Sequence, residues 1–141
     1  MSGTLIATVG LPGSGKTTWA RQWVAENPAR RARINRDDLR AMLHGGRVGT
    51  AWQERQVTLA QHAAVRALLL HGFEVVVDDT NLVAKHRQQL EAIARECGAK
   101  VVIRRFDDVP VETCIARDAR RPRRQRVGEA VIRRMAAAAE W

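Results

Sequence analysis

Short apolar runs alternate along the chain with longer segments whose apolar residues recur at helical spacing. Four short runs predict strands: Thr4–Val9, Arg33–Asn35, Phe73–Val77 and Lys100–Phe106. The helical spacing predicts helices at Thr17–Glu26, Leu39–Leu43, Ala51–His71, Leu82–Cys97, Val111–Ala119 and Gly128–Ala139. Strands that alternate with helices through short connections predict an α/β fold, in which helices cover both faces of a parallel sheet.

Two of these helices carry tryptophans whose environment the pattern predicts. Trp19 and Trp23 lie four residues apart, so they share one helix face, and we expect them to pack in the core. Trp52 begins the long helix and is also expected to pack, with stacking on a nucleobase as the alternative. The expected inner face of that helix contains Val57, Ala60, Ala64 and Leu68.

Composition sets the broad class of the protein. The chain has 141 residues, of which 45% are apolar and 28% charged, as in a globular protein with one domain over Met1–Trp141. No apolar run approaches the roughly 20 residues of a membrane span, and Met1 is not followed by a secretory leader. Cys97 and Cys114 lack metal-site spacing. We therefore expect a cytoplasmic protein with reduced thiols and no membrane partner.

The charge of the chain is unusually basic. Lys and Arg number 24 against 15 Asp and Glu, which gives a net charge of +9, and lysine occurs only at Lys16, Lys85 and Lys100. Arginine binds phosphate through two parallel hydrogen bonds and stacks on bases. This composition favours a polyphosphate or nucleic-acid partner, although basic charge that serves only solubility is the alternative.

The stretch Gly10–Thr17 fits the phosphate-loop pattern G-x-x-x-x-G-K-[ST] between a predicted strand and a predicted helix. Such a loop points backbone N–H groups at phosphates, while Lys16 reaches the β- and γ-phosphates and Thr17 ligates Mg²⁺. The sequence therefore predicts binding of ATP or another nucleoside triphosphate. The nucleotide-binding residues expected here are Gly10, Pro12, Gly13, Ser14, Gly15, Lys16, Thr17 and Thr18.

Acidic residues follow two predicted strands. Asp37 stands at a strand-to-helix junction, where it either caps the helix or accepts the proton of an attacking hydroxyl. Asp78 and Asp79 follow the most strand-like run, at the sheet edge where ligands bind in open α/β folds. Solvated turn residues are the alternative. Magnesium is expected on Thr17, with Asp37 or Asp78 contributing through water.

The densest charge run has six arginines within ten residues: Arg117, Arg120, Arg121, Arg123, Arg124 and Arg126. One interpretation is a solvated basic loop. In a phosphotransferase, the same run predicts a lid whose arginines neutralise charge on the transferring phosphate.

Three blocks, GLPGSGKTTWARQW, INRDDLR and VVVDDTNL, precede this basic run. Together they resemble the 5′-kinase domain of bacteriophage polynucleotide kinase, a P-loop kinase that phosphorylates 5′-hydroxyl ends of DNA and RNA. The resemblance runs from about Thr4 to Met135. It implies that Asp37 is the general base and that Arg40 contacts phosphate beside it. Asp79, Thr80 and Val127 are implied to bind the acceptor nucleotide.

On the donor side, the resemblance implies that Arg121 touches the transferring phosphate and that Arg117 flanks the nucleotide. The preferred hypothesis is thus an ATP- and Mg²⁺-dependent polynucleotide 5′-hydroxyl kinase of nucleic-acid repair. No D-x-D-G-T phosphatase signature occurs, so no 3′-phosphatase activity is expected from this chain. A separate phosphatase or ligase partner is left open. A small P-loop kinase of a metabolite or nucleoside hydroxyl, and a non-catalytic nucleic-acid-binding module, are the alternatives. DNA versus RNA, ATP versus GTP and a homo-oligomer are left open.

Overall fold

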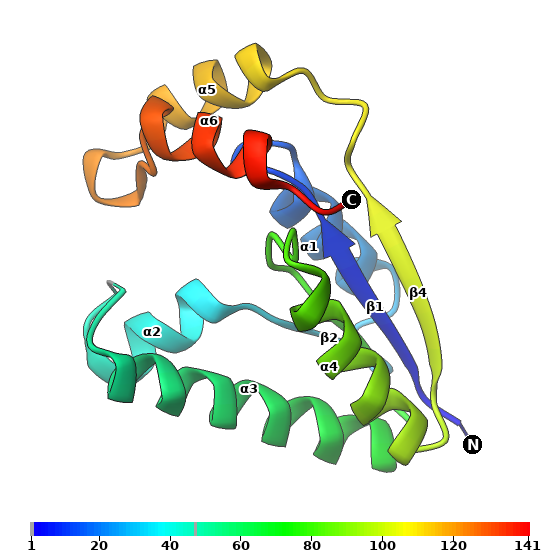
Figure 1. Ribbon diagram of the computed structural model, residues 1–141. Helices are drawn as coiled ribbons and strands as arrows, with labels where there is room; N and C mark the ends of the chain where they lie inside the picture. The colour runs from blue at the N-terminus through cyan, green and yellow to red at the C-terminus, as the bar shows by residue number, and fades with distance from the viewer. Residues whose placement is uncertain (1, 47) are drawn as a thin grey trace.

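The computed structural model describes residues 2–46 and 48–141. Its centre is a parallel sheet of four strands in the order β2-β3-β1-β4 (Figure 1). The strands are β1 (Thr4–Val9), β2 (Arg31–Ile34), β3 (Glu74–Val77) and β4 (Lys100–Arg105). Their carboxyl ends meet at one edge of the sheet, from which the phosphate loop follows β1. The predicted α/β fold is confirmed.

Helices cover both faces of the sheet, as predicted. The helices are α1 (Lys16–Glu26), α2 (Arg36–His44), α3 (Ala51–Leu70), α4 (Ala84–Glu96), α5 (Val111–Ala119) and α6 (Glu129–Ala138). On one face, α3 and α4 pack against Leu5 and Val75 of the sheet. On the other face, α1 packs Trp19 and Trp23 against Ile6, and the two indole rings stack with their centroids 6.3 Å apart. The expected packing of these two tryptophans is confirmed.

Three local expectations are corrected. The second strand covers Arg31–Ile34 instead of Arg33–Asn35, because the Asn35 side chain accepts a hydrogen bond from the Asp38 N–H and caps α2. The buried face of α3 consists of Val57, Gln61, Val65 and Leu69. It shares Val57 with the expected face and is shifted by one residue at the other three positions. Trp52 does not pack: it is 81% exposed.

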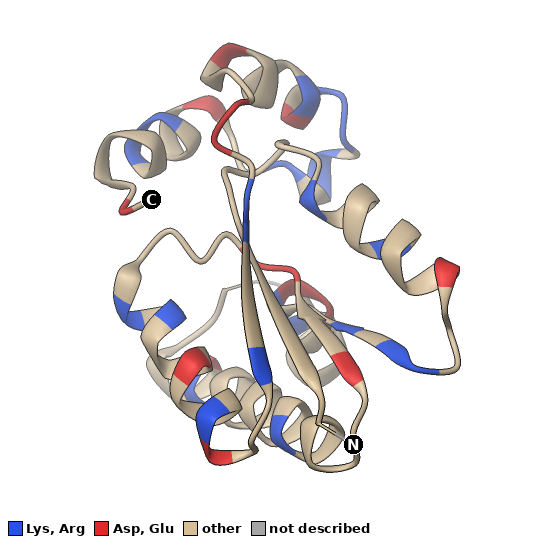
Figure 2. Cartoon of the chain, turned by 90° about the vertical axis from the view of Figure 1, so that its right-hand side faces the viewer, with Lys and Arg blue, Asp and Glu red and all other residues tan. Residues whose placement is uncertain are grey.

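The helices α5 and α6 pack on each other beyond the carboxyl ends of the strands (Figure 1). Cys114 and Ile132 form the buried centre of this contact. The connection between the two helices contains a short 3-10 helix, Arg123–Gln125, and basic residues gather along it (Figure 2). We call Arg117–Arg126 the arginine segment. Its closure over a bound nucleotide stays a prediction.

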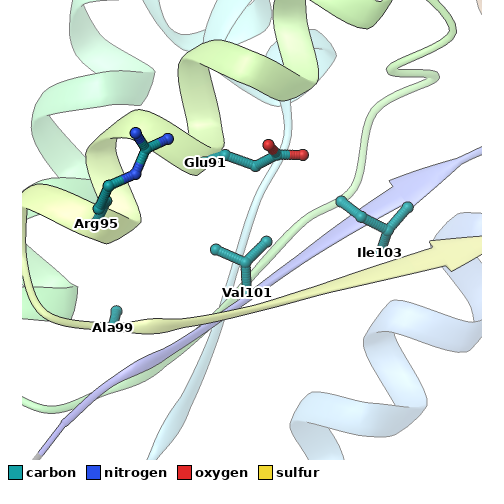
Figure 3. Close-up of a pocket in the computed structure, with 5 residues that line it drawn as sticks. All are labelled: Glu91, Arg95, Ala99, Val101 and Ile103. Carbon is teal, nitrogen blue, oxygen red and sulfur yellow. The ribbon is translucent and has the colours of Figure 1, made fainter.

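An open cavity of about 430 Å³ lies between α4 and the edge strand β4, lined by Glu91, Arg95, Ala99, Val101 and Ile103 (Figure 3). None of these residues belongs to the predicted site. Among the described residues, no helix is long and apolar enough to cross a membrane.

Candidate active site

The phosphate loop is fixed by close backbone contacts. Gly13 and Gly15 have φ angles of 82° and 98°, a region that favours glycine. A Cβ atom at Gly13 would overlap the carbonyl oxygen of Cys114 in α5, and one at Gly10 would lie 2.7 Å from the Ser14 Oγ. The Gly10 N–H donates to the Thr80 carbonyl over 3.0 Å. The loop is therefore held between α5 and the acidic end of β3.

Lys16 is folded back into the loop. Its Nζ donates to the Leu11 carbonyl at 2.7 Å and to the Ser14 Oγ at 3.4 Å. Burial lowers the pKa of Lys16 to about 8; the charge of Asp78 opposes this shift, and the charge of Arg121 adds to it. The lysine is thus poised beside the loop with little solvation, and phosphate oxygens would replace its two oxygen partners.

Asp78 fits the expected role beside a metal ion. Its side chain is fully buried, and Oδ2 accepts from the Arg33 Nε at 2.8 Å. Within the described residues, the buried Oδ1 has no hydrogen-bond partner. A buried carboxylate oxygen of this kind commonly receives a water or an ion. Asp78 therefore fits Mg²⁺ bound through water better than Asp37, whose side chain is 82% exposed and paired with arginine.

Asp37 and Arg40 belong to an ion-pair network between α2 and α3. The Arg40 NH1 donates to the Asp37 Oδ1 at 2.7 Å. The Nε and NH2 groups of Arg40 both donate to Glu54 of α3, at 2.8 and 2.7 Å. This bidentate contact, joined by Arg36, lowers the pKa of Glu54 to about 2. Because Glu54 fixes the Arg40 guanidinium, the ion pair with Arg40 orients the Asp37 carboxylate, which stays accessible to solvent.

Asp79 lies behind this network at the end of β3. Its Oδ1 accepts from the Arg36 N–H at 2.9 Å and its Oδ2 from the Gln61 Nε2 at 2.7 Å. Burial raises the pKa of Asp79, although these two hydrogen bonds oppose the shift. The backbone of Asp79 is fixed as well, because the Thr8 hydroxyl donates to the Asp79 carbonyl at 2.9 Å. Asp79 therefore joins β3 to α2 and α3.

The arginine segment is anchored by a buried aspartate. Asp118 is 2% exposed and accepts from the N–H groups of Val127 and Gly128, each at 2.9 Å. Arg121 lies 3.5 Å from the same carboxylate, and Arg117 donates to the Gly13 carbonyl at 3.3 Å. Arg117 therefore contacts the phosphate loop from α5, whereas Arg121, just after this helix, pairs with Asp118. Val127 packs against the buried cluster between α5 and α6.

An open pocket of about 420 Å³ adjoins the phosphate loop. It is lined by Gly15, Thr18, Trp19, Gln22 and Arg117. The pocket contains an aromatic ring, a guanidinium and an amide, groups that can stack on a base and bond to its edge. Its position beside the loop suits the nucleoside of a bound triphosphate. Thr18, expected to bind nucleotide, lies in this wall, whereas Pro12 is buried within the loop.

Sequence reasoning missed three residues of this site: Glu54, Gln61 and Asp118. Each is separated from its partner by several to many positions along the chain, and no short motif contains it. The sequence contains two weak signals of these residues. Gln61 is a polar residue at core spacing on an otherwise apolar helix face, and Asp118 is the one acidic residue inside the basic run.

The loop, the parallel sheet and the acids at its carboxyl edge define a nucleotide-binding kinase of the P-loop type. A family model described as an AAA domain matches residues 5–141, and the chain belongs to this family. It is also similar to a chain in the structure of the Pnkp1/Rnl/Hen1 RNA repair complex. That pair is 30% identical with a TM-score of 0.84, over 97% of this chain and 44% of the other.

A second Pnkp1/Rnl/Hen1 structure is 34% identical, with a TM-score of 0.74 over 82% of this chain and 39% of the other. This chain thus spans less than half the length of either match. Kti12 from Chaetomium thermophilum, in complex with ADP-AlF3, is 24% identical with a TM-score of 0.74 over 97% and 80% of the chains. Mycobacterium tuberculosis APS kinase CysC, in complex with AMPPNP and APS, is 21% identical with a TM-score of 0.68 over 84% and 70%. The last two share the fold.

Proposed function

We propose that this protein is an ATP- and Mg²⁺-dependent polynucleotide 5′-hydroxyl kinase. The observation that carries the proposal is the network of Asp37, Arg40 and Glu54 at the sheet edge that also holds the phosphate loop. A solvent-accessible carboxylate held by an arginine beside a phosphate loop suits a base that activates an incoming hydroxyl.

The donor phosphates lie on the loop in this proposal. Backbone N–H groups of Gly13 and Gly15 and the ammonium of Lys16 hold the β- and γ-phosphates. Thr17 and, through water, Asp78 hold Mg²⁺, which supplies positive charge to the phosphate oxygens when bound. Arg117 of α5, which bonds to the Gly13 carbonyl, and Arg121, which follows α5, complete the positive surroundings of the donor.

The acceptor hydroxyl then lies at Asp37. Its Oδ1 is occupied by Arg40, while Oδ2 makes no hydrogen bond within the described residues and is free to take a proton. The hydroxyl oxygen forms a bond to the γ-phosphorus, the bond from that phosphorus to ADP breaks, and the proton passes to Asp37. Asp79, Thr80 and Val127 bind the terminal nucleotide of the acceptor.

Two observations support a nucleic acid as the acceptor. The exposed arginines of the arginine segment have no carboxylate partner among the described residues, apart from Arg121, and this fits binding to a phosphate backbone. The likeness to a chain of an RNA repair complex also supports a role in nucleic-acid repair. We propose that a separate phosphatase or ligase completes that reaction sequence.

The test follows the γ-phosphate of labelled ATP, with Mg²⁺, onto matched 5′-hydroxyl DNA and RNA oligonucleotides. We expect label at the 5′ end, reduced by a factor of about 10²–10⁴ in Asp37→Asn, with ATP binding retained. The ratio of the transfer rates to the two oligonucleotides shows whether DNA or RNA is the preferred acceptor. ATP binding without transfer to either oligonucleotide would contradict the proposal, and a screen of small hydroxyl acceptors would then test the metabolite kinase.

A further inference from the structure

Arg33 bridges the two sides of the site. It lies near the end of β2, and its side chain is 15% exposed. Its Nε donates to the Asp78 Oδ2 at 2.8 Å, and its NH1 donates to the Asp38 Oδ2 at 2.7 Å. Asp78 belongs to the donor side, whereas Asp38 lies in the first turn of α2, directly after Asp37. One guanidinium therefore joins a donor-side carboxylate to the helix that carries Asp37.

Asn35 makes a second connection between the same two residues. Its Nδ2 donates to the Asp78 carbonyl, and its Oδ1 accepts from the Asp38 N–H at 3.0 Å. The Asp78 N–H also donates to the Ile34 carbonyl at 3.0 Å, which continues the pairing of β2 with β3. The main chain of Asp78 is thus held at both its N–H and its carbonyl group. Arg33 adds a contact that holds the carboxylate itself.

The Asp78 carboxylate has one oxygen engaged and one oxygen left over. Arg33 bonds to Oδ2, and within the described residues the buried Oδ1 has no hydrogen-bond partner. The N–H groups of a guanidinium have a fixed planar geometry, so bonds to two carboxylates fix its orientation. A carboxylate held by such a group through one oxygen keeps the other oxygen in a defined direction. In the proposed site, that oxygen accepts from a water of the hydrated Mg²⁺.

The neighbouring Arg31 makes a similar bridge away from the phosphate loop. It lies two residues earlier in β2, so the two arginines leave the same face of the strand. Arg31 contacts Glu26 of α1 and Glu74 of β3, both at 3.3 Å. The helical acids of the two bridges are equally accessible, because the side chain of Glu26 is 59% exposed and that of Asp38 is 61% exposed. The chain therefore contains an internal control for the Arg33 bridge.

We propose that Arg33 is a positioning residue for phosphoryl transfer, which fixes the Asp78 carboxylate on the Mg²⁺ side and, through Asp38, the first turn of α2. This inference rests on the proposed function. The hydroxyl at Asp37 must meet the γ-phosphate in line, and a displacement of about 1 Å lowers the rate of such a step by about a hundredfold. Arg33 touches neither substrate in this arrangement. It acts by fixing the separation between Asp37 and the metal-bound phosphates.

The test uses the whole chain and two variants that alter the bridge at different points. Arg33→Lys keeps the charge but replaces the planar group by a point charge on a flexible stem. Asp38→Ala leaves the contact between Arg33 and Asp78 in place and removes the connection to α2. The matched controls, Arg31→Lys and Glu26→Ala, make the same kinds of change in the second bridge.

Three measurements are made on all four variants. Transfer of labelled γ-phosphate to 5′-hydroxyl oligonucleotides gives kcat and the KM for ATP. Calorimetry gives the affinity for ATP as a function of Mg²⁺ concentration, independently of any transfer. Thermal melts compare the stability of each variant with that of its control.

We expect Arg33→Lys and Asp38→Ala to lower kcat by about 10-fold to 100-fold, with the KM for ATP unchanged at saturating Mg²⁺. Arg33→Lys should also raise the Mg²⁺ concentration needed for ATP binding by about tenfold, because this variant frees the Asp78 carboxylate. Asp38→Ala should leave that concentration unchanged. The two controls should match the wild type in both assays, with melting temperatures similar to those of their partners.

The outcomes separate this role from the kinase itself. Normal kcat in both Arg33→Lys and Asp38→Ala would overturn the positioning role while the kinase stands. Equal losses in the two controls would also overturn it, because the effect would then follow from the loss of any ion pair on β2. No transfer by the wild type would overturn the kinase. A higher Mg²⁺ requirement in Arg33→Lys alone would then still support its hold on Asp78, and an unchanged requirement would overturn that as well.

Discussion

The donor and acceptor sides of the site are built in different ways. The phosphate loop comes from one continuous stretch, Gly10–Thr17, and is held by backbone contacts to α5 and to Thr80. The acceptor side joins α2, α3 and β3 through side chains, with Arg40 held between Asp37 and Glu54. The loop is nearly buried, whereas the Asp37 side chain is 82% exposed.

Because they are built differently, the two sides should respond differently to substitutions. At Gly10 and Gly13 the backbone-held loop tolerates almost no added atoms, because the nearest neighbours are the Ser14 Oγ and the Cys114 carbonyl oxygen. A network of side-chain ion pairs tolerates changes in size but fails when one charge is removed.

The largest effect is expected from Gly13→Ala. The new Cβ would overlap the Cys114 carbonyl at a φ angle of 82°. We expect a loss of about 3 kcal/mol or more in the free energy of unfolding, and ATP affinity reduced by roughly a hundredfold. Gly98→Ala is the control, because Gly98 also has a positive φ of 64° but no neighbour within 4 Å. The free energy of unfolding of Gly98→Ala should fall by about 1 kcal/mol, from backbone strain alone. Equal losses in thermal melts would contradict the role given to the contact with α5.

Glu54→Ala should produce the next largest effect. Removing this carboxylate leaves the 13% exposed Arg40 side chain with Asp37 as its remaining carboxylate partner. We expect kcat to fall by about a hundredfold, with the KM for ATP unchanged, and the free energy of unfolding to fall by about 2 kcal/mol. Glu54→Asp should restore part of the rate, because the charge is kept.

The control for Glu54 is Glu96→Ala, which breaks the exposed ion pair with Arg66. An exposed pair of this kind contributes less than about 1 kcal/mol, and no change in rate is expected. A normal kcat in Glu54→Ala would show that Arg40 does not depend on this carboxylate for its position.

These two sides also differ in how far the sequence predicts them. The place of the loop between β1 and α1 could be predicted, since its residues are contiguous, while their roles in nucleotide binding stay predictions. Asp37, Arg40 and Asp79 were named as well, but Glu54 and Gln61 were not. Their partners become neighbours only when α3 packs beside α2 and β3, and sequence spacing does not record that contact. The alternation of strands and helices predicted the fold, while strand ends shifted where a side chain such as Asn35 caps the next helix.

On the donor side, the titration of Lys16 should make both ATP affinity and stability depend on pH, with an effect of intermediate size. Its pKa of about 8 lies below the usual lysine value of 10.5, because burial disfavours the charged amine. Phosphate binding needs the charged form, so ATP affinity should fall by up to about tenfold per pH unit above 8. The unliganded protein should become more stable over the same range, because the unfolded chain then binds more protons. This gain is on the order of 3 kcal/mol between pH 8 and 10.5.

Calorimetric titration with ATP and denaturant unfolding at a series of pH values measure these two opposite trends. Lys16→Met is the control, and its stability should lose the rise between pH 8 and 10.5. ATP affinity that stays constant up to pH 10 would show that the charge of Lys16 is not needed for binding.

The smallest effect is expected from Trp52→Ala, on the acceptor side. Because its side chain is 81% exposed, the free energy of unfolding should change by less than about 0.5 kcal/mol. Trp19→Ala should cost about 2 kcal/mol, since Trp19 stacks on Trp23 and meets Phe106 edge-on at 6.1 Å. Denaturant unfolding compares the two variants. A loss above 1 kcal/mol in Trp52→Ala would mean that the indole packs after all, whereas a higher KM for an oligonucleotide at unchanged stability would assign it to stacking on an acceptor base.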